Sequence, residues 1–298
     1  MLALASPASL KGVLSASEAA AALVAGFARM GAEAKALPIA DGGEGTADVL
    51  GARELRRVRI HDAFGRDREA PLRALPDGTV VVESAEAIPL DPSRLDVLAA
   101  SSRGLGELIV GAGECPRLLV CLGGTANMDG GAGLLEVLER LPAPTTVLCD
   151  TRATLLEAPL AFGPQKGASE DEIAELERRF ARLPQNDLPG GGAAGGLGAA
   201  LASLGADLVP GAQYVLDTIG FREHAAAADL VVTGEGRVDR TTFEGKAPGE
   251  ALRACRELAV RCVLFGGLVD EGIDAVPLSG DAARAREDLE ELPPRLRR

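Results

Sequence analysis

The sequence predicts an α/β fold built on a largely parallel sheet. Four short apolar runs are each followed by a helical pattern: MLALA before 15–30, LPIA before 44–51, LLVCLGG before 130–140, and DLVVTGEG before 246–259. This alternation is typical of βαβ units. Apolar residues make up 47% of the chain but aromatic residues only 3%, so Ala, Val and Leu must fill the core, which suits helices packed on a parallel sheet. The length of 298 residues favours two domains.

Three further segments have their own patterns. Ser15 and Glu18 have the spacing of a capping box at the start of the first helix. Residues 53–84 contain short Val- and Ile-rich runs between turn-rich segments, which predicts antiparallel strands and a change of domain. Residues 170–182 are densely charged at helical spacing and predict a solvated surface helix, whereas 287–298 are expected to fray.

Composition excludes several classes of partner. The formal net charge is -13, which disfavours nucleic acid and anionic membranes because both need a basic surface. The five cysteines form no CxxC pair and are expected to be buried thiols in a reducing compartment. No signal segment and no membrane-spanning apolar run is evident, so a cytoplasmic location is expected.

Three segments share one design, an apolar strand followed by a glycine-rich loop with acidic residues and then a helix. They are PIADGGEGT (38–46), VCLGGTANMDGGAG (120–133) and VVTGEGRVDRTTFEGK (231–246). Glycines let the backbone approach a ligand, and the helix that follows presents free N–H groups. Loops of this kind are suited to binding phosphate.

The acidic residues in these loops would repel phosphate unless a metal ion accompanied it. The carboxylates concerned are Asp41, Glu44, Asp129, Glu235 and Asp239. Bound Mg²⁺ resolves the conflict, because carboxylates hold the ion and the ion holds the phosphates. Any one loop is equally well explained as a tight turn with a capping Asp. Three such loops in one chain favour a Mg²⁺-nucleotide enzyme.

Other sequence fingerprints fit poorly. Gly190, Gly192 and Gly195 satisfy GxGxxG, but no buried strand is expected before them, and a Walker A sequence is absent. His61 and His224 have no partners at metal or triad spacing. Lys166 and Lys246 each follow a glycine-containing loop and are candidate phosphate-binding cations.

The chain resembles the glycerate kinase family, in a shortened and divergent form. The matching segments are SLKGVLSASEAA, PIADGGEGTADVL, CLGGTANMDGGAGLL, FGPQKGAS, PGGGAAGGLGAAL and DLVVTGEGRVDRTTFEGKAP, which run in the family's order over most of the chain. The resemblance implies two α/β domains, with the active site in the cleft between them. One is flavodoxin-like, has a parallel sheet and is assembled from residues 1–55 and 222–298. The other is inserted and spans residues 56–221.

The resemblance also implies a reaction, its cofactors and a set of site residues. We expect phosphorylation of D-glycerate with ATP and Mg²⁺, with 2-phosphoglycerate favoured as product, while the oligomeric state stays open. The expected catalytic residues are Asp41, Asp239 and Lys246, with Asp41 or Asp239 orienting the substrate hydroxyl. Asp129 and Glu235 are expected to hold the metal. Substrate or phosphate is expected at Lys11, Gly42, Gly43, Glu44, Gly123, Gly124, Thr125, Gln165, Lys166, Glu235 and Arg237.

Three departures from the family pattern leave alternatives open. Ala8 replaces an aspartate before Lys11, Met128 replaces an asparagine before Asp129, and the loop at 151–161 is shorter and lacks glycine. Ala8 and Met128 are expected at positions where the family presents polar groups to the cleft. The alternatives are an inactive or weak paralogue that still binds nucleotide or a small acid, and a kinase for a related hydroxy acid.

Overall fold

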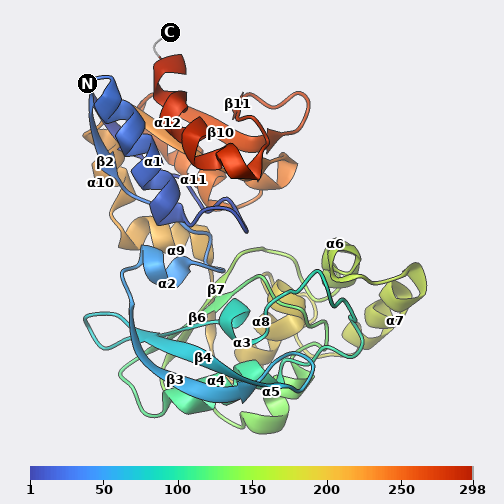
Figure 1. The fold of residues 1–298 in the computed structure, drawn as a ribbon. Coiled ribbons are helices and arrows are strands. Elements are labelled where there is room, and N and C mark those ends of the chain that lie inside the picture. The colour runs from blue at the N-terminus through green and yellow to red at the C-terminus, as the bar shows by residue number, and fades with distance from the viewer. Residues whose placement is uncertain (297–298) are drawn as a thin grey trace. The chain divides into compact units, whose positions relative to one another are not determined.

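The computed structural model describes residues 1–296, which fold as two compact units. Unit 1 comprises Met1–Asp41, Asp48–Leu50 and the described residues from Ala212 onward, and unit 2 comprises Gly42–Ala47 and Gly51–Gly211. Figure 1 shows the N-terminal α1 and β2 in blue together with the red C-terminal α12 in unit 1, while unit 2 runs from the blue of β3 through green to the yellow of α8. No helix within residues 1–296 is long and apolar enough to cross a membrane.

Unit 1 is built on a five-stranded sheet in which all neighbouring strands are parallel. Its strands are β1 (Leu2–Ala5), β2 (Glu33–Ala36), β9 (Leu230–Val238), β10 (Cys262–Val269) and β11 (Val276–Pro277). They lie in the order β11-β10-β9-β1-β2. Numbered within the unit this is 5-4-3-1-2, the flavodoxin-like strand order. The predicted α/β class with a flavodoxin-like parallel sheet is therefore confirmed.

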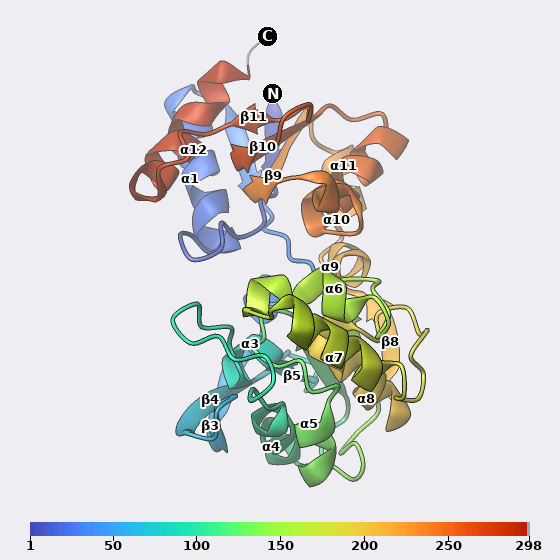
Figure 2. The ribbon, with the colours of Figure 1, turned by 90° about the vertical axis from the view of Figure 1, so that its right-hand side faces the viewer.

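Helices cover both faces of this sheet, because successive strand residues point to opposite sides. Ala3 and Ala5 of β1 pack with Leu23 of α1 (Ala16–Arg29) and Leu289 of α12 (Ala285–Arg295). Leu4 belongs to a separate core formed with α9 (Gly211–Thr218), α10 (Phe221–Ala226) and α11 (Ala247–Glu257). Figure 2 shows α1 and α12 on one side of the sheet and α10 and α11 on the other.

Unit 2 contains a mixed six-stranded sheet in the order β3-β4-β5-β6-β7-β8. Its strands are β3 (Arg53–His61), β4 (Asp67–Ala74), β5 (Val80–Glu83), β6 (Leu118–Leu122), β7 (Thr145–Cys149) and β8 (Asp207–Pro210). The pairs β3·β4 and β4·β5 are antiparallel, as predicted for 53–84, and β5 to β8 are parallel.

The helices of unit 2 follow the strands in the expected alternation. They are α3 (Ser84–Ala87), α4 (Arg103–Ala112), α5 (Ala132–Val137), α6 (Ala158–Phe162), the short 3₁₀ helix η1 (Pro164–Lys166), α7 (Glu170–Phe180) and α8 (Ala193–Ser203). Leucines of α4, α5 and α8 share one core with alternate residues of β4 to β7. α7 is the predicted charged helix, and it buries Leu176 and Phe180.

Local signals predicted some elements correctly and misplaced others. The capping box of Ser15 and Glu18 is present at the start of α1. The strand predicted at LPIA lies earlier, at Glu33–Ala36, a polar edge strand that pairs only with β1. The predicted helices at 44–51 and 130–140 are shorter, being α2 (Thr46–Val49) and α5.

The C-terminal segment does not fray over its described part, contrary to the prediction. α12 runs to Arg295 with two prolines in its last turn, and it buries Leu289 and Leu292 fully. Packing explains this order, because Gly26 of α1 lets the backbone of α12 approach: a Cβ on Gly26 would lie 2.3 Å from the Glu290 carbonyl oxygen. Residues 297–298 of the predicted tail lie outside the described residues.

Candidate active site

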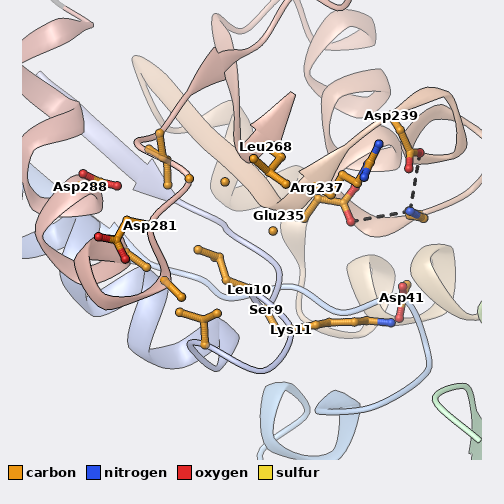
Figure 3. Close-up of a pocket in the computed structure, with 18 residues that line it drawn as sticks. Ser9, Leu10, Lys11, Asp41, Glu235, Arg237, Asp239, Leu268, Asp281 and Asp288 are labelled. Atoms are coloured by element: carbon orange, nitrogen blue, oxygen red, sulfur yellow. Dashed lines mark ion pairs between the residues drawn. The ribbon is translucent and has the colours of Figure 1, made fainter. Parts of the chain in front are cut away.

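Unit 1 contains a pocket of about 410 Å³ at the carboxyl ends of its strands. Six residues predicted as site residues line it: Lys11, Asp41, Glu235, Arg237, Asp239 and Lys246. They come from three segments, following β1, following β2, and running from β9 into α11. Figure 3 shows them in the pocket, with the Lys11 side chain extending toward Asp41.

The strand order explains why these segments meet. Strands β1 and β9 are adjacent, but their connections run in opposite directions along the sheet, β1 leading to β2 and β9 to β10. The loops leaving these two strands therefore diverge and leave a crevice at the carboxyl edge, where ligands of open α/β sheets bind. Lys11 lies on one of these loops, and Asp239 and Lys246 lie on the other.

Lys246 lies between two carboxylates of the same loop. Its Nζ is 3.9 Å from Oε2 of Glu235 and 3.9 Å from Oδ1 of Asp239. Burial raises the pKa of Glu235, and the nearby charges of Asp41 and Asp239 add to that effect, while Lys246 and a 2.8 Å hydrogen bond from the Thr242 hydroxyl oppose it. The carboxylates of Asp41, Glu235 and Asp239 are thus close enough to repel one another, and an additional cation would stabilise them.

Asp239 both caps a turn and faces this charged group. Its Oδ1 accepts a hydrogen bond of 2.8 Å from the Thr241 backbone N–H at the start of η2 (Arg240–Phe243). Partial burial raises its pKa, but the Thr241 hydrogen bonds and the Lys246 charge outweigh that effect, so the net shift is downward. Asp239 is therefore held as an ionised, oriented acceptor at neutral pH. Arg237, in contrast, forms an exposed ion pair with Asp270 at 2.9 Å.

Unit 2 brings the first two glycine-rich loops together. A Cβ on Gly123 would lie 3.1 Å from the Cα of Gly43, and one on Gly124 would lie 3.5 Å from Oε2 of Glu44. Gly42 has φ +94°, and a Cβ there would lie 2.6 Å from the Cα of Gly211, so both its conformation and its packing require glycine. The two loops that contain these predicted residues, with Thr125 among them, therefore lie side by side in unit 2.

Two consecutive residues that the sequence did not single out hold these loops. Glu83, at the end of β5, accepts a 2.7 Å hydrogen bond from the Ala47 backbone N–H. The next residue, Ser84, donates its hydroxyl to the Gly123 carbonyl at 3.0 Å and accepts from the Gly123 N–H at 3.1 Å. The sequence signal was available: VVVES ends a buried strand in two polar residues.

Removing the Glu83 carboxylate should disturb the loop that begins at Gly42. Glu83 is buried, and this burial raises the pKa of its carboxyl group. The hydrogen bond from the Ala47 backbone N–H opposes that shift. We expect Glu83→Ala to leave the buried Ala47 N–H unpaired, at a cost of about 1–3 kcal/mol, and to lower activity. Glu83→Gln keeps an acceptor oxygen and should retain most of the stability and most of the activity. Melting temperatures and kcat/KM of the two variants test this, and equal behaviour of Ala and Gln would contradict it.

Lys166 is the second predicted lysine cation, and it is buried in unit 2. Its Nζ donates to the Asn127 carbonyl at 2.7 Å and lies 3.5 Å from Oγ1 of Thr125. Burial lowers its pKa to about 8, while the charges of Asp150 and Asp129 partly oppose that shift. Asp150, directly after β7, was not predicted as a site residue; its Oδ2 also lies 2.7 Å from the position of a Cβ on Gly123. Gln165, beside Lys166 in η1, is exposed.

Asp129 organises the second loop through five hydrogen bonds. Its two oxygens accept from the N–H and hydroxyl of Ser102, the N–H groups of Gly131 and Gly133, and the Asn127 side-chain amide. Asp129 lies in unit 2 and Glu235, the other predicted metal ligand, in unit 1. Within residues 1–296, no group of three or more His, Cys, Asp or Glu side chains is arranged to hold a metal ion by itself.

Met128 and Ala8 pack against apolar neighbours, contrary to the expectation for these positions. Met128 is 1% exposed and lies in an apolar cluster with Leu155 and Phe180. The neighbouring Asn127 supplies the amide in this loop, donating to Asp129 and to the Ala194 carbonyl. Ala8 packs beside the core that contains Leu4, and its N–H pairs with the Gly234 carbonyl. Asn127 and Met128 are both buried, and Asn127 rather than residue 128 carries the polar group that is hydrogen-bonded inside the fold.

The glycines of PGGGAAGGLG serve packing. Gly195 and Gly196 have φ of +70° and +99°, and a Cβ on Gly195 would lie 2.1 Å from the Asn127 carbonyl oxygen. This segment therefore supports the loop of Asn127 and Asp129 from behind, and a side chain there would displace that loop.

A family model, relatives in sequence and a solved structure all match this chain over most of its length. The sequence matches the model of the Glycerate kinase family over residues 3–141 and 139–286. It is 33% identical to a glycerate 2-kinase of Escherichia coli K12, with 91% of this chain and 88% of the relative covered. It is 34% identical to a glycerate kinase of Bacillus subtilis 168, with 91% and 86% covered. A crystal structure of a candidate glycerate kinase 2 from Salmonella typhimurium LT2 matches with a TM-score of 0.74 and 30% identity, covering 98% of this chain and 96% of that one.

Proposed function

This chain belongs to the glycerate kinase family, and we propose that it transfers the terminal phosphoryl group of ATP to D-glycerate with Mg²⁺ as cofactor. The observation that carries the proposal is the pocket of unit 1, where Lys11, Lys246 and three carboxylates meet at the strand switch point. Phosphoryl transfer needs positioning and charge stabilisation more than covalent chemistry from the protein. Oriented lysines and an ionised carboxylate supply both.

Each charged residue has a role in this proposal. Lys246 neutralises charge on the transferred phosphoryl group, and Lys11 approaches the same pocket from the loop after β1. Asp239, whose pKa is lowered, accepts a hydrogen bond from the substrate hydroxyl, and Asp41 is the other candidate for that role. In unit 2, Lys166 and the N–H groups of the glycine loops bind anionic oxygens.

The carboxylates of the pocket fit the magnesium ion that a nucleotide substrate requires. Mg²⁺ in such sites uses one or two protein carboxylates, and phosphate oxygens and water complete its coordination. Glu235 and Asp41 would hold it: the pKa of Glu235 is raised mainly by burial and further by the charge of Asp41, and a divalent cation would favour the ionised form of both. The ion would supply charge neutralisation to the phosphates. Asp129 is less suited to this role, since its oxygens already accept five hydrogen bonds.

The product we propose is 2-phosphoglycerate, and the name of the Escherichia coli relative, a glycerate 2-kinase, supports this choice. The test is an ADP-release assay with ATP, Mg²⁺ and a panel of short hydroxy acids, with the product position read by ³¹P NMR. Glycerate should be the best substrate. A preference for another acid would favour the related hydroxy-acid kinase, and no turnover with any acid would overturn the proposal.

Nucleotide binding should depend on the metal. ATP with Mg²⁺ is expected to raise the melting temperature through ligand linkage, whereas ATP with EDTA should produce no rise, because Asp41, Glu235 and Asp239 repel bare triphosphate. Differential scanning fluorimetry measures both. A rise of equal size in EDTA would show that the carboxylates do not need a cation to accept the nucleotide.

A further inference from the structure

The pocket of unit 1 has two chemically different ends. Lys11, Lys246 and the carboxylates around them form the charged end. The other end is lined mainly by apolar side chains and glycine backbone: Leu10, Val13, Gly267, Leu268, Leu278, Gly280, Ala282 and Ala285. These residues come from the loop after β1, from β10, and from the segment between β11 and α12. None of these apolar residues was predicted from the sequence as a site residue, although Leu10 directly precedes the predicted Lys11.

Two large apolar side chains at this end face solvent. Leu268 is 54% exposed and Val13 is 40% exposed. Exposed apolar area costs about 25 cal/mol per Å² relative to burial, and exposed apolar side chains gathered in a concave wall mark ligand sites more often than scattered ones do. Figure 3 shows Leu268 directed into the pocket.

The backbone keeps this end open. Gly280 has φ +78°, and a Cβ there would lie 3.3 Å from Cδ2 of Leu268. A Cβ on Gly267 would lie 2.6 Å from the Gly236 carbonyl oxygen. A side chain at position 280 would displace Leu268, and one at position 267 would displace the β9 backbone. This part of the pocket surface therefore consists of glycine backbone and the Leu268 side chain.

Two carboxylates at the apolar end disfavour an anion there. Asp281 and Asp288 line the pocket there. Both also stabilise the β11–α12 segment: Asp288 accepts from the Ser279 N–H at 3.0 Å, and Asp281 accepts from the Ala283 N–H at 2.9 Å. Carboxylates repel the carboxylate of a hydroxy acid and the phosphates of a nucleotide, but they accept hydrogen bonds from hydroxyl and amine donors. This end suits an uncharged, partly apolar group with such donors.

We propose that the apolar end of the pocket binds the base and ribose of the phosphoryl-donor nucleotide, with its phosphates directed to Lys11 and Lys246. The proposal rests on the proposed function for the identity of the donor. A base fits against Leu268 and Val13, and ribose hydroxyls are the donors that the aspartates accept. The volume of about 410 Å³ lies within the roughly 300–1,000 Å³ of small-molecule sites.

Binding of ADP and of pyrophosphate separates the two ends of the pocket. Isothermal titration calorimetry is carried out with each ligand in the presence of Mg²⁺, on the wild type and on Leu268→Ala. The variant should bind ADP at least about tenfold more weakly, as lost apolar contacts typically do, and should bind pyrophosphate unchanged. The matched control is Leu55→Ala, a leucine on β3 of unit 2 that is 53% exposed and should bind both ligands like the wild type.

A second variant fills the pocket instead of emptying it. Leu268→Trp should exclude ADP while leaving the melting temperature near that of the wild type, because position 268 is exposed. Unchanged ADP affinity in both variants, or an equal loss of ADP and pyrophosphate, would overturn the proposal. Calorimetry needs no turnover, so it tests the nucleoside subsite even if the hydroxy-acid assay is negative. An active enzyme whose ADP affinity is unchanged by substitution of Leu268 would refute the subsite and leave the proposed function standing.

Discussion

Lys246→Ala is expected to lower kcat by at least about 10²-fold, the usual effect of removing one group that stabilises developing charge. Its Nζ lies 3.9 Å from both Glu235 and Asp239 in the pocket. Partly exposed ion pairs at this distance contribute about 0–1 kcal/mol, so the melting temperature should fall by at most about 2–4 °C. Steady-state kinetics and thermal unfolding of the same preparation measure the two effects.

The chain offers a matched control for this substitution. It has four lysines, Lys11, Lys35, Lys166 and Lys246, and Lys35 is exposed on the edge strand β2. Lys35→Ala should therefore leave kcat unchanged. Lys246→Ala should also raise the pKa of Asp239, since the cation lowers it, and so move the acid limb of the pH–rate profile to higher pH. A variant that unfolds would give Lys246 a structural role, and a folded variant that turns over like Lys35→Ala would show that Lys246 has no catalytic role.

Lys166→Met is expected to remove most turnover while keeping or raising stability. The ammonium is buried, and burial lowers its pKa to about 8, so the folded state pays to hold the charge. Met has a similar length and removes that cost. The loss in kcat/KM should be about 10²-fold or more if Lys166 binds anionic oxygens. A destabilised variant with unchanged kcat would show that the lysine serves only to hold the Asn127 loop.

The pH dependence of stability provides an independent readout of this lysine. Between pH 8 and pH 10.5 the unfolded chain still binds a proton that the folded chain has released, so the free energy of unfolding should rise with pH across that window. The rise is on the order of 3 kcal/mol for the full shift, and below about pH 8 this lysine contributes no slope. Urea unfolding of the wild type and of Lys166→Met at several pH values should differ in this slope. Equal slopes would contradict a lowered pKa for Lys166.

Local patterns predicted those features whose cause is local. The capping box that starts α1, the amphipathic stripe of α7 and the strands that lead into the second and third glycine-rich segments each depend on residues a few positions apart, and each is present in the structure. Two of the errors in the fold, the displaced strand and the ordered C-terminal helix, have long-range causes. β2 forms at the polar residues 33–36 because β1 offers a free edge there, and α12 stays helical through two prolines because it packs on α1.

The sequence by itself determined the family, the α/β class and which loops carry the charged residues, because these depend on ordered motifs and on hydrophobic spacing. Only the tertiary structure decided how those residues are grouped. Strand order, which no local pattern specifies, brings Lys11, Asp41 and the β9–α11 loop into one pocket of unit 1. It places Lys166 beside Asn127 and Thr125 in unit 2. Side-chain direction depends on packing. It places Met128 in the core and brings Glu83, Ser84 and Asp150 next to the two glycine-rich loops of unit 2.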